Sequence, residues 1–149
     1  VLSALGPWLA PLGGLRATGV AGLVDDGCNA NPDSVRAAID ALAACDGRRV
    51  LVLGDMGEVG DQGAQFHREV GAHARERGVA HLLALGDATR DSVDAFGAHG
   101  EHFGSVEALI ERAREMCEPG TTVLVKGSRF MKMERVVAAL AAGPDRERH

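Results

Sequence analysis

Short apolar runs alternate along this chain with segments in which apolar residues recur at helical spacing. Three of the runs end in glycine, namely "VLVLG" (Val50–Gly54), "HLLALG" (His81–Gly86) and "TVLVKG" (Thr122–Gly127). A fourth run, "GLVDD", ends at Asp26. Continuous apolar runs of this length are typical of strands that are buried on both faces.

Helical periodicity fills the stretches between these runs. Three sets of apolar residues each fall on one helical face: Val35, Ala38, Ile39 and Leu42; Val106, Leu109, Ile110, Ala113 and Cys117; and Phe130, Met133, Val137 and Leu140. Strands that alternate with helices predict an α/β fold with a mainly parallel sheet and helices on both faces. Ligands of such sheets bind at the carboxyl ends of the strands, so we expect a site in the segments that follow Asp26, Leu53, Leu85 and Lys126.

Residues 1–19 do not follow the alternation, and we interpret them as a linker or the tail of a preceding domain. The α/β domain is expected at residues 20–142, and residues 143–149 are expected to form a frayed tail. We predict no signal peptide in residues 1–19. Because the chain begins at Val1 and not at methionine, we expect it to be a piece of a larger protein.

Composition limits the class of protein and its partners. With 46% apolar and 25% charged residues among 149, the chain matches a folded globular domain. A formal net charge of −5 without a basic stripe argues against a nucleic-acid partner, and no apolar run is long enough to insert across a membrane. Cys28, Cys45 and Cys117 have no CxxC spacing, so we predict neither a disulfide framework nor a zinc site, and a cytoplasmic location fits best.

Polar residues gather where the first long predicted strand meets a helix, in "VDDGCNANPDSV". Asn31 before Pro32 is a suitable helix N-cap, so helix initiation explains part of this motif. It does not explain why Asp25, Asp26 and Asn29 gather at the end of the strand. Asp26 could accept hydrogen bonds from ribose hydroxyls, and Asn29 could donate and accept at a base or sugar. A nucleotide site and a simple helix cap both remain open.

A second candidate site is "VLVKGSRFMKMERV", in which a buried strand brings Lys126 to its tip. Gly127 would permit a tight turn, and Ser128 and Arg129 would open a helix whose N-terminal N–H groups favour an anion. These features predict a site for a carboxylate or a phosphate. The alternative is a solvated basic turn in which Ser128 is only a helix cap.

The glycine-rich stretch "LGDMGEVGDQGAQFH" contains Asp55, Glu58 and Asp61, which are possible ligands of a divalent ion. Their spacing matches no calcium loop, so we favour a mobile loop and predict no metal site. His67, on the following helix, is expected to be a surface or half-buried residue and not a catalytic one.

The stretch "LGDATRD" predicts a turn and a helix capped by Asp87. His73, His81, His99 and His102 show no ligand spacing, and we assign them no role. The sequence has no GxxxxGK[ST] phosphate loop, no GxGxxG turn, no GxSxG elbow and no HExxH motif. It therefore offers ligand-binding segments without a complete catalytic motif.

Three motifs in order, "LVDDGCNANPDSVRAAIDAL", "VLVLGDMGEVGDQGAQFHREVG" and "VLVKGSRFMKMERVV", resemble the carboxyl-terminal domain of the Mur ligases. They are most similar to the members that add D-alanyl-D-alanine to UDP-N-acetylmuramoyl-tripeptide in peptidoglycan synthesis. The resemblance implies a three-layer, Rossmann-like domain with a mixed sheet of about six strands, of which one near Leu15–Val20 is antiparallel. In the family this domain closes over ATP and Mg²⁺, which are bound mainly by a central domain that carries the phosphate loop.

The resemblance also implies a nucleotide site. Asp26 matches the family aspartate that binds the ribose hydroxyls, and Asn29 and Asn31 match the asparagines beside the nucleotide. Arg16 stands for the arginine that precedes the carboxyl-terminal domain. Cys28 occupies the position of a tyrosine that is usual in the family, so the resemblance supplies no aromatic contact to the nucleotide at that point.

Lys126, Ser128 and Arg129 match the family turn where the incoming dipeptide would lie, and we expect an anion site there to hold the dipeptide carboxylate. In the family, ATP converts the tripeptide carboxylate to an acyl phosphate, which the amine of the dipeptide attacks. Lacking a phosphate loop, residues 1–149 alone are expected to be inactive. Two alternatives remain: a stand-alone module that binds a nucleotide or carboxylate, and another ligase of the superfamily, which the KGSR turn disfavours.

Overall fold

A computed structural model describes residues 9–10, 19–24, 32–45, 47–56, 62–116, 121–127 and 132–142. The elements in chain order are β1 (Leu9–Ala10), β2 (Gly19–Val24), α1 (Pro32–Ala43), β3 (Arg48–Gly54), α2 (Gly63–Glu76), β4 (His81–Leu85), α3 (Arg90–Phe96), β5 (Gly100–Phe103), α4 (Val106–Met116), β6 (Thr121–Gly127) and α5 (Glu134–Ala142). The strands form one sheet in the order β1-β2-β6-β3-β4-β5. Only β1 is antiparallel to its neighbour among these strands, and the other pairs are parallel. The predicted α/β fold with a mixed, mainly parallel sheet is confirmed.

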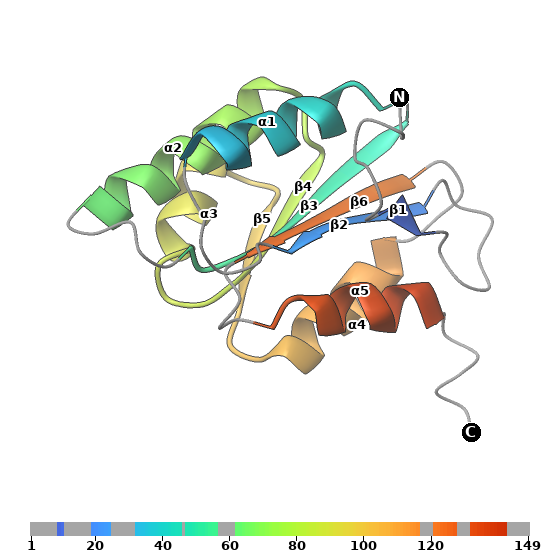
Figure 1. Cartoon of the computed structure of the whole chain (residues 1–149). Coiled ribbons are helices and arrows are strands. Elements are labelled where there is room, and N and C mark those ends of the chain that lie inside the picture. The colour runs from blue at the N-terminus through green and yellow to red at the C-terminus, as the bar shows by residue number, and fades with distance from the viewer. Residues whose placement is uncertain are drawn as a thin grey trace.

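Helices cover both faces of the sheet, with α1, α2 and α3 on one face and α4 and α5 on the other (Figure 1). Successive residues of a strand point to opposite faces, and each central strand therefore contributes to two cores. Leu51 and Leu53 of β3 belong to the buried cluster beneath α1 and α2, whereas Val50 and Val52 belong to the cluster that α4 and α5 cover. This double burial is the reason why the strands appear in the sequence as continuous apolar runs.

The apolar faces predicted for the helices are confirmed wherever the structure describes them. Buried residues on these faces are Val35, Ala38, Ile39, Leu42, Val106, Leu109, Ala113, Met133 and Leu140, and Ile110 is partly buried. Cys117 and Phe130 lie outside the described residues, as does the side chain of Val137. Within the part of the chain that the structure covers, no helix is both long and apolar enough to cross a membrane.

The structure corrects the prediction at the two edges of the sheet. The antiparallel strand is Leu9–Ala10, which pairs with β2, and not the segment near Leu15–Val20. Val20 belongs instead to β2, where it lies opposite Val123 of β6 in a parallel pair. The other edge strand, β5, was not predicted, because its residues are only half-buried and carry no continuous apolar run.

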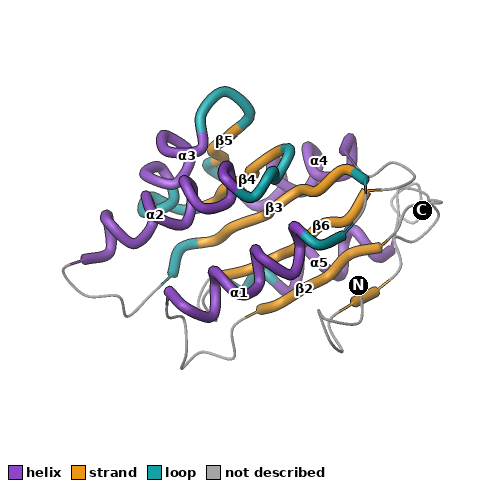
Figure 2. The backbone as a smooth tube through the Cα atoms, turned by 90° about the horizontal axis from the view of Figure 1, so that it is seen from above, coloured by secondary structure: helices purple, strands orange, loops and turns teal. Residues whose placement is uncertain are grey.

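The connections of the central strands reverse direction beside β6, which lies between β2 and β3 (Figure 2). The chain passes from β2 and β3 to α1 and α2 on one face, but from β6 to α5 on the opposite face. Open α/β sheets bind ligands at the carboxyl ends of strands where such a reversal occurs. A ligand of this fold is therefore expected at the carboxyl ends of β2, β6 and β3.

Candidate functional site at the carboxyl ends of the strands

Lys126 lies near the carboxyl end of the central strand β6, as predicted. Its register partners are Leu23 of β2 and Leu53 of β3, and the residue is only 7% exposed. Packing on both sides therefore fixes the position of the lysine.

Of the residues predicted to bind a nucleotide or a dipeptide, Lys126 is the one within the described part of the chain. The others lie outside it: Arg16, Asp26, Asn29, Asn31, Ser128 and Arg129. The strands that lead to the two predicted segments are neighbours, and Val24 at the end of β2 pairs with Gly127 at the end of β6. The two motifs therefore leave the sheet from adjacent strand ends.

The described residues on either side of positions 128–131 show why Gly127 is a glycine. A Cβ atom at Gly127 would lie 2.6 Å from Cγ of Met133, whose side chain is fully buried. Lys132 has a φ of 53°, a left-handed conformation that costs a non-glycine residue on the order of 1 kcal/mol. The close approach of Met133, and not a left-handed turn at Gly127 itself, requires the absence of a side chain at this position.

Asp55 follows β3 and holds the turn after β4. Its Oδ1 atom accepts a hydrogen bond from the backbone N–H of Thr89 at 3.1 Å, and the Thr89 hydroxyl donates to the carbonyl oxygen of Gly86 at 2.6 Å. Gly86 has a φ of 109°, and a Cβ atom there would collide with the Asp55 carboxylate. Asp55 thus joins the end of β3 to the start of α3.

This arrangement corrects the predicted cap. Asp87 was expected to cap the helix, but its side chain is fully exposed, and the residue at the N-cap position is Thr89. Among the possible metal ligands, Glu58 and Asp61 lie outside the described residues. The residues that the structure describes contain no group of three histidine, cysteine or acidic side chains able to hold a metal ion.

His67 is fully buried, so the expectation of a surface or half-buried residue was wrong. Its Nε2 atom accepts a hydrogen bond from the backbone N–H of Met56 at 3.1 Å, and its Nδ1 atom lies 2.7 Å from the carbonyl oxygen of Gly63. A signal was present in the sequence, since His67 shares its helical face with the buried residues Phe66 and Val70. The spacing of residues along the helix does not identify the hydrogen-bond donor of His67, which is Met56, eleven positions earlier.

The other histidines of α2 and β5 have structural partners. Nε2 of His102 lies 2.7 Å from the carbonyl oxygen of Gly86 and must carry the proton, because a carbonyl oxygen only accepts. His73 lies 2.8 Å from the Asp40 carboxylate and thereby joins α2 to α1. Through its bond to Gly86, His102 connects β5 to the turn that Asp55 holds.

His81 and His99 meet near the opposite, amino-terminal end of β4, with ring centroids 5.1 Å apart. Burial lowers the pKa of His81 below its ordinary value of 6.5, and the positive charge of Arg48 is the next cause. His99 and Arg112 lower this pKa further, and Glu101 partly opposes them. This cluster lies away from the predicted ligand site.

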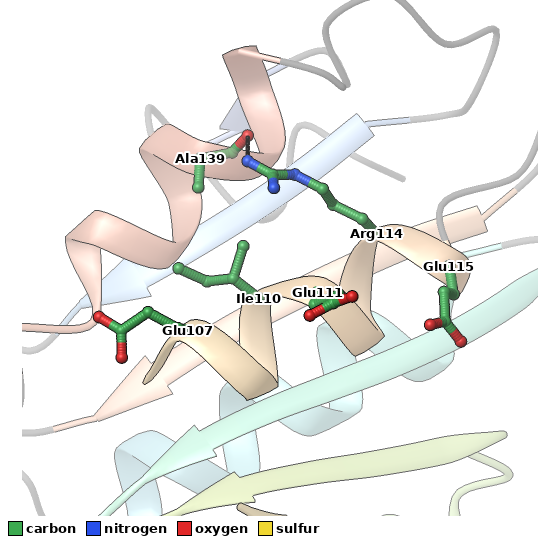
Figure 3. Close-up of a pocket in the computed structure, with 6 residues that line it drawn as sticks. All are labelled: Glu107, Ile110, Glu111, Arg114, Glu115 and Ala139. Atoms are coloured by element: carbon green, nitrogen blue, oxygen red, sulfur yellow. Dashed lines mark hydrogen bonds between the residues drawn. The ribbon is translucent and has the colours of Figure 1, made fainter. Parts of the chain in front are cut away.

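A separate hollow lies between α4 and α5 (Figure 3). Its lining residues all come from these two helices: Glu107, Ile110, Glu111, Arg114, Glu115 and Ala139. Arg114 donates a hydrogen bond to the carbonyl oxygen of Ala139 at 3.4 Å, and Glu115 pairs with Arg112 at 2.7 Å. The first of these contacts joins α4 to α5, and the second lies within α4.

Comparison with known proteins identifies the class to which this fold belongs. The family model described as "Mur ligase, glutamate ligase domain" matches residues 16–129, and the chain belongs to this family. The resemblance noted from the three motifs is thereby confirmed.

Curated relatives in the family carry the name UDP-N-acetylmuramoyl-tripeptide–D-alanyl-D-alanine ligase. The relative from Escherichia coli K12 is 42% identical over 120 residues, which cover 79% of this chain and 26% of the relative. The relative from Bacillus subtilis is 30% identical over 155 residues, which cover 89% of this chain and 33% of the relative. The chain therefore spans about a quarter to a third of the length of these relatives.

Solved structures agree with this assignment. A MurF structure from Acinetobacter baumannii has a TM-score of 0.68 and 32% identity, and the match covers 78% of this chain and 26% of that one. MurF from Thermotoga maritima, solved in complex with ADP, has a TM-score of 0.71 at 22% identity, with 88% of this chain and 30% of that chain covered. At that identity the second likeness supports the fold alone.

Proposed function

We propose that this chain is the carboxyl-terminal domain of an ATP-dependent ligase that adds D-alanyl-D-alanine to UDP-N-acetylmuramoyl-tripeptide. The observation that carries the proposal is the match to ligases of that name across 79% of the chain, at 42% identity for the relative from Escherichia coli. The ligase would act in the cytoplasm, where it would serve peptidoglycan synthesis and with it cell shape and division.

In this proposal, Lys126 binds the carboxylate of the incoming dipeptide together with Ser128 and Arg129. The position of Lys126 supports this role, because the residue is 7% exposed and lies at the carboxyl end of the central strand. An ammonium in that setting attracts a carboxylate more strongly than it would in water. The dipeptide amine would then be free to attack the activated tripeptide.

Asp26, Asn29 and Asn31, which follow β2, would contact the nucleotide from the neighbouring strand end, and Arg16, which precedes β2 in the chain, would contact it as well. The pairing of Val24 with Gly127 supports a common site, because the nucleotide segment and the dipeptide segment would begin side by side. ATP supplies the activation of the tripeptide carboxylate when it is bound. Its Mg²⁺ ion would be held mainly by a preceding domain, and this domain would complete the site when the two close together.

The test has two parts. An antibody against residues 1–149 identifies the natural gene product that carries this chain and gives its mass, and a ligation assay is then run on that gene product. We expect a product much heavier than 15.5 kDa that joins D-alanyl-D-alanine to UDP-N-acetylmuramoyl-tripeptide only when ATP is present. The matched control is the 149-residue chain alone, which should form no ligation product. A gene product of 15.5 kDa that binds the dipeptide or the nucleotide without ligation would overturn the proposal in favour of a binding module.

A further inference from the structure

The protonation state of His67 follows from its two ring partners. A backbone N–H group can only donate, so the contact with Met56 requires Nε2 to be an unprotonated acceptor. Nδ1 must then carry the proton and donate it to the carbonyl oxygen of Gly63. The imidazole is therefore neutral, and both of its nitrogens are used.

These two bonds connect the chain just after β3 to the start of α2. Met56 is the second residue after β3, and Gly63 is the first residue of α2. The N-cap residue of α2, Gln62, makes no side-chain capping bond. His67 thus connects the end of the strand to the start of the helix across the glycine-rich segment between them.

The same residue is also fixed from α3. The hydroxyl of Ser92, which is fully buried, donates a hydrogen bond to the carbonyl oxygen of His67 at 2.5 Å. Gly71, one turn along α2, lies so close to Ser92 that a Cβ atom there would collide with the Ser92 backbone. These contacts with α3 therefore fix the backbone of α2 at His67.

The position that His67 fixes follows the strand that pairs with Lys126. Leu53, the register partner of Lys126 on β3, precedes Met56 by three residues in the sequence. A shift of the chain at Met56 would act on the end of β3, the strand that pairs with β6 beside the lysine. Because a displacement of about 1 Å in a binding site can cost a large factor in rate or affinity, the bond to Met56 bears on ligand binding.

We propose that His67 is a positioning residue that holds the carboxyl end of β3 against α2 through its neutral imidazole, and so sets the site at Lys126 for a carboxylate ligand. The last part of this proposal rests on the proposed function. The hydrogen-bond arrangement itself does not, and it can be tested on the 149-residue chain.

Two substitutions separate the two bonds of His67. In His67→Gln the side-chain oxygen reaches the position of Nε2 and can still accept from the Met56 N–H. In His67→Asn the shorter side chain reaches only the position of Nδ1, so the Met56 N–H loses its acceptor. Nitrogen NMR of the wild-type chain should show the proton on Nδ1 of His67. The Met56 amide should exchange with solvent about tenfold faster in His67→Asn than in His67→Gln, as expected for the loss of one hydrogen bond.

In the natural gene product, the KM for D-alanyl-D-alanine should rise about tenfold in His67→Asn and clearly less in His67→Gln, with a smaller change in kcat. A proton on Nε2 in the wild type, or equal exchange at Met56 in the two variants, would overturn the hydrogen-bond arrangement. Equal KM values in the two variants would overturn the positioning role. If a variant does not fold, the wild-type ring spectrum still decides the arrangement, and absent ligase activity would count against the proposed function alone.

Discussion

The Asp55 carboxylate accepts a hydrogen bond from the backbone N–H of Thr89, 34 residues later in the chain, at 3.1 Å. Asp55 follows β3, and Thr89 is the N-cap residue of α3. Asp55 therefore accepts from the N-cap N–H, the donor that the N3 side chain satisfies in a capping box.

Replacing Asp55 with alanine should lower the free energy of unfolding by about 1–2 kcal/mol, as for the loss of a helix cap. Asp55→Asn keeps an oxygen at the accepting position and should cost less than half as much. Urea unfolding of the 149-residue chain measures both values. An unchanged midpoint for Asp55→Ala would mean that the bond to Thr89 does not support the fold.

Gly86→Ala should destabilise the chain by about 2–4 kcal/mol. The φ of 109° at this residue disfavours any side chain, and the new methyl group would meet the Asp55 carboxylate. Gly104→Ala is the matched control, because a Cβ atom there has no atom within 4 Å, and its free energy of unfolding should change by less than about 0.5 kcal/mol. Equal effects of the two substitutions in urea unfolding would contradict the described turn.

The contact between Gly127 and Met133 predicts a coupling between substitutions. Gly127→Ala should cost about 1–3 kcal/mol because the methyl group meets Cγ of Met133, and Met133→Ala should cost about 2–5 kcal/mol as a buried truncation. The double variant should be more stable than the sum of the two losses predicts, since each change relieves the other. Strict additivity in thermal or urea unfolding would show that the two residues do not touch.

The pKa of His81 predicts how stability changes with pH. Because burial and Arg48 lower this pKa in the folded chain below 6.5, the unfolded chain binds more protons in the window just below that value. Stability should therefore rise with pH through this window and fall as the solution is acidified. His81→Gln should flatten the dependence of the melting temperature on pH below 6.5.

A control for this prediction is His99→Gln, which removes one neighbour of His81 at a centroid distance of 5.1 Å. This substitution should reduce the slope of the melting temperature against pH only in part, since burial and the charge of Arg48 still lower the pKa of His81. Identical slopes in the wild type and in His81→Gln would show that His81 does not contribute.

The sequence predicted the central strands and helices because each is buried in a way that periodicity reveals. Val50 and Leu51 enter different cores, so their strand has no polar face and appears as an apolar run. The edges gave no such signal. Leu9 and Ala10 form a strand of two residues, and β5 is half-buried, so neither produces a pattern that distinguishes it from a loop.

Within the site, the sequence placed Lys126 correctly because a strand and its tip are local features. The functions of Asp55 and His67 depended on partners 34 and 11 residues away, which no local pattern specifies. The exposed Asp87 illustrates the same limit, because it has the residue type and position of a cap, while Asp55, distant in the sequence, supplies the acceptor.

The most direct test of the account compares D-alanyl-D-alanine with its carboxyl-terminal amide as substrates of the natural gene product, in the wild type and in Lys126→Met. If Lys126 binds the dipeptide carboxylate, the wild type should lose about 10- to 100-fold in kcat/KM on the amide, as for a charge-assisted hydrogen bond. Lys126→Met, which keeps the buried volume without the charge, should distinguish the two substrates little. Undiminished preference for the carboxylate in Lys126→Met would show that this lysine does not hold it, and would contradict the site described at the end of β6.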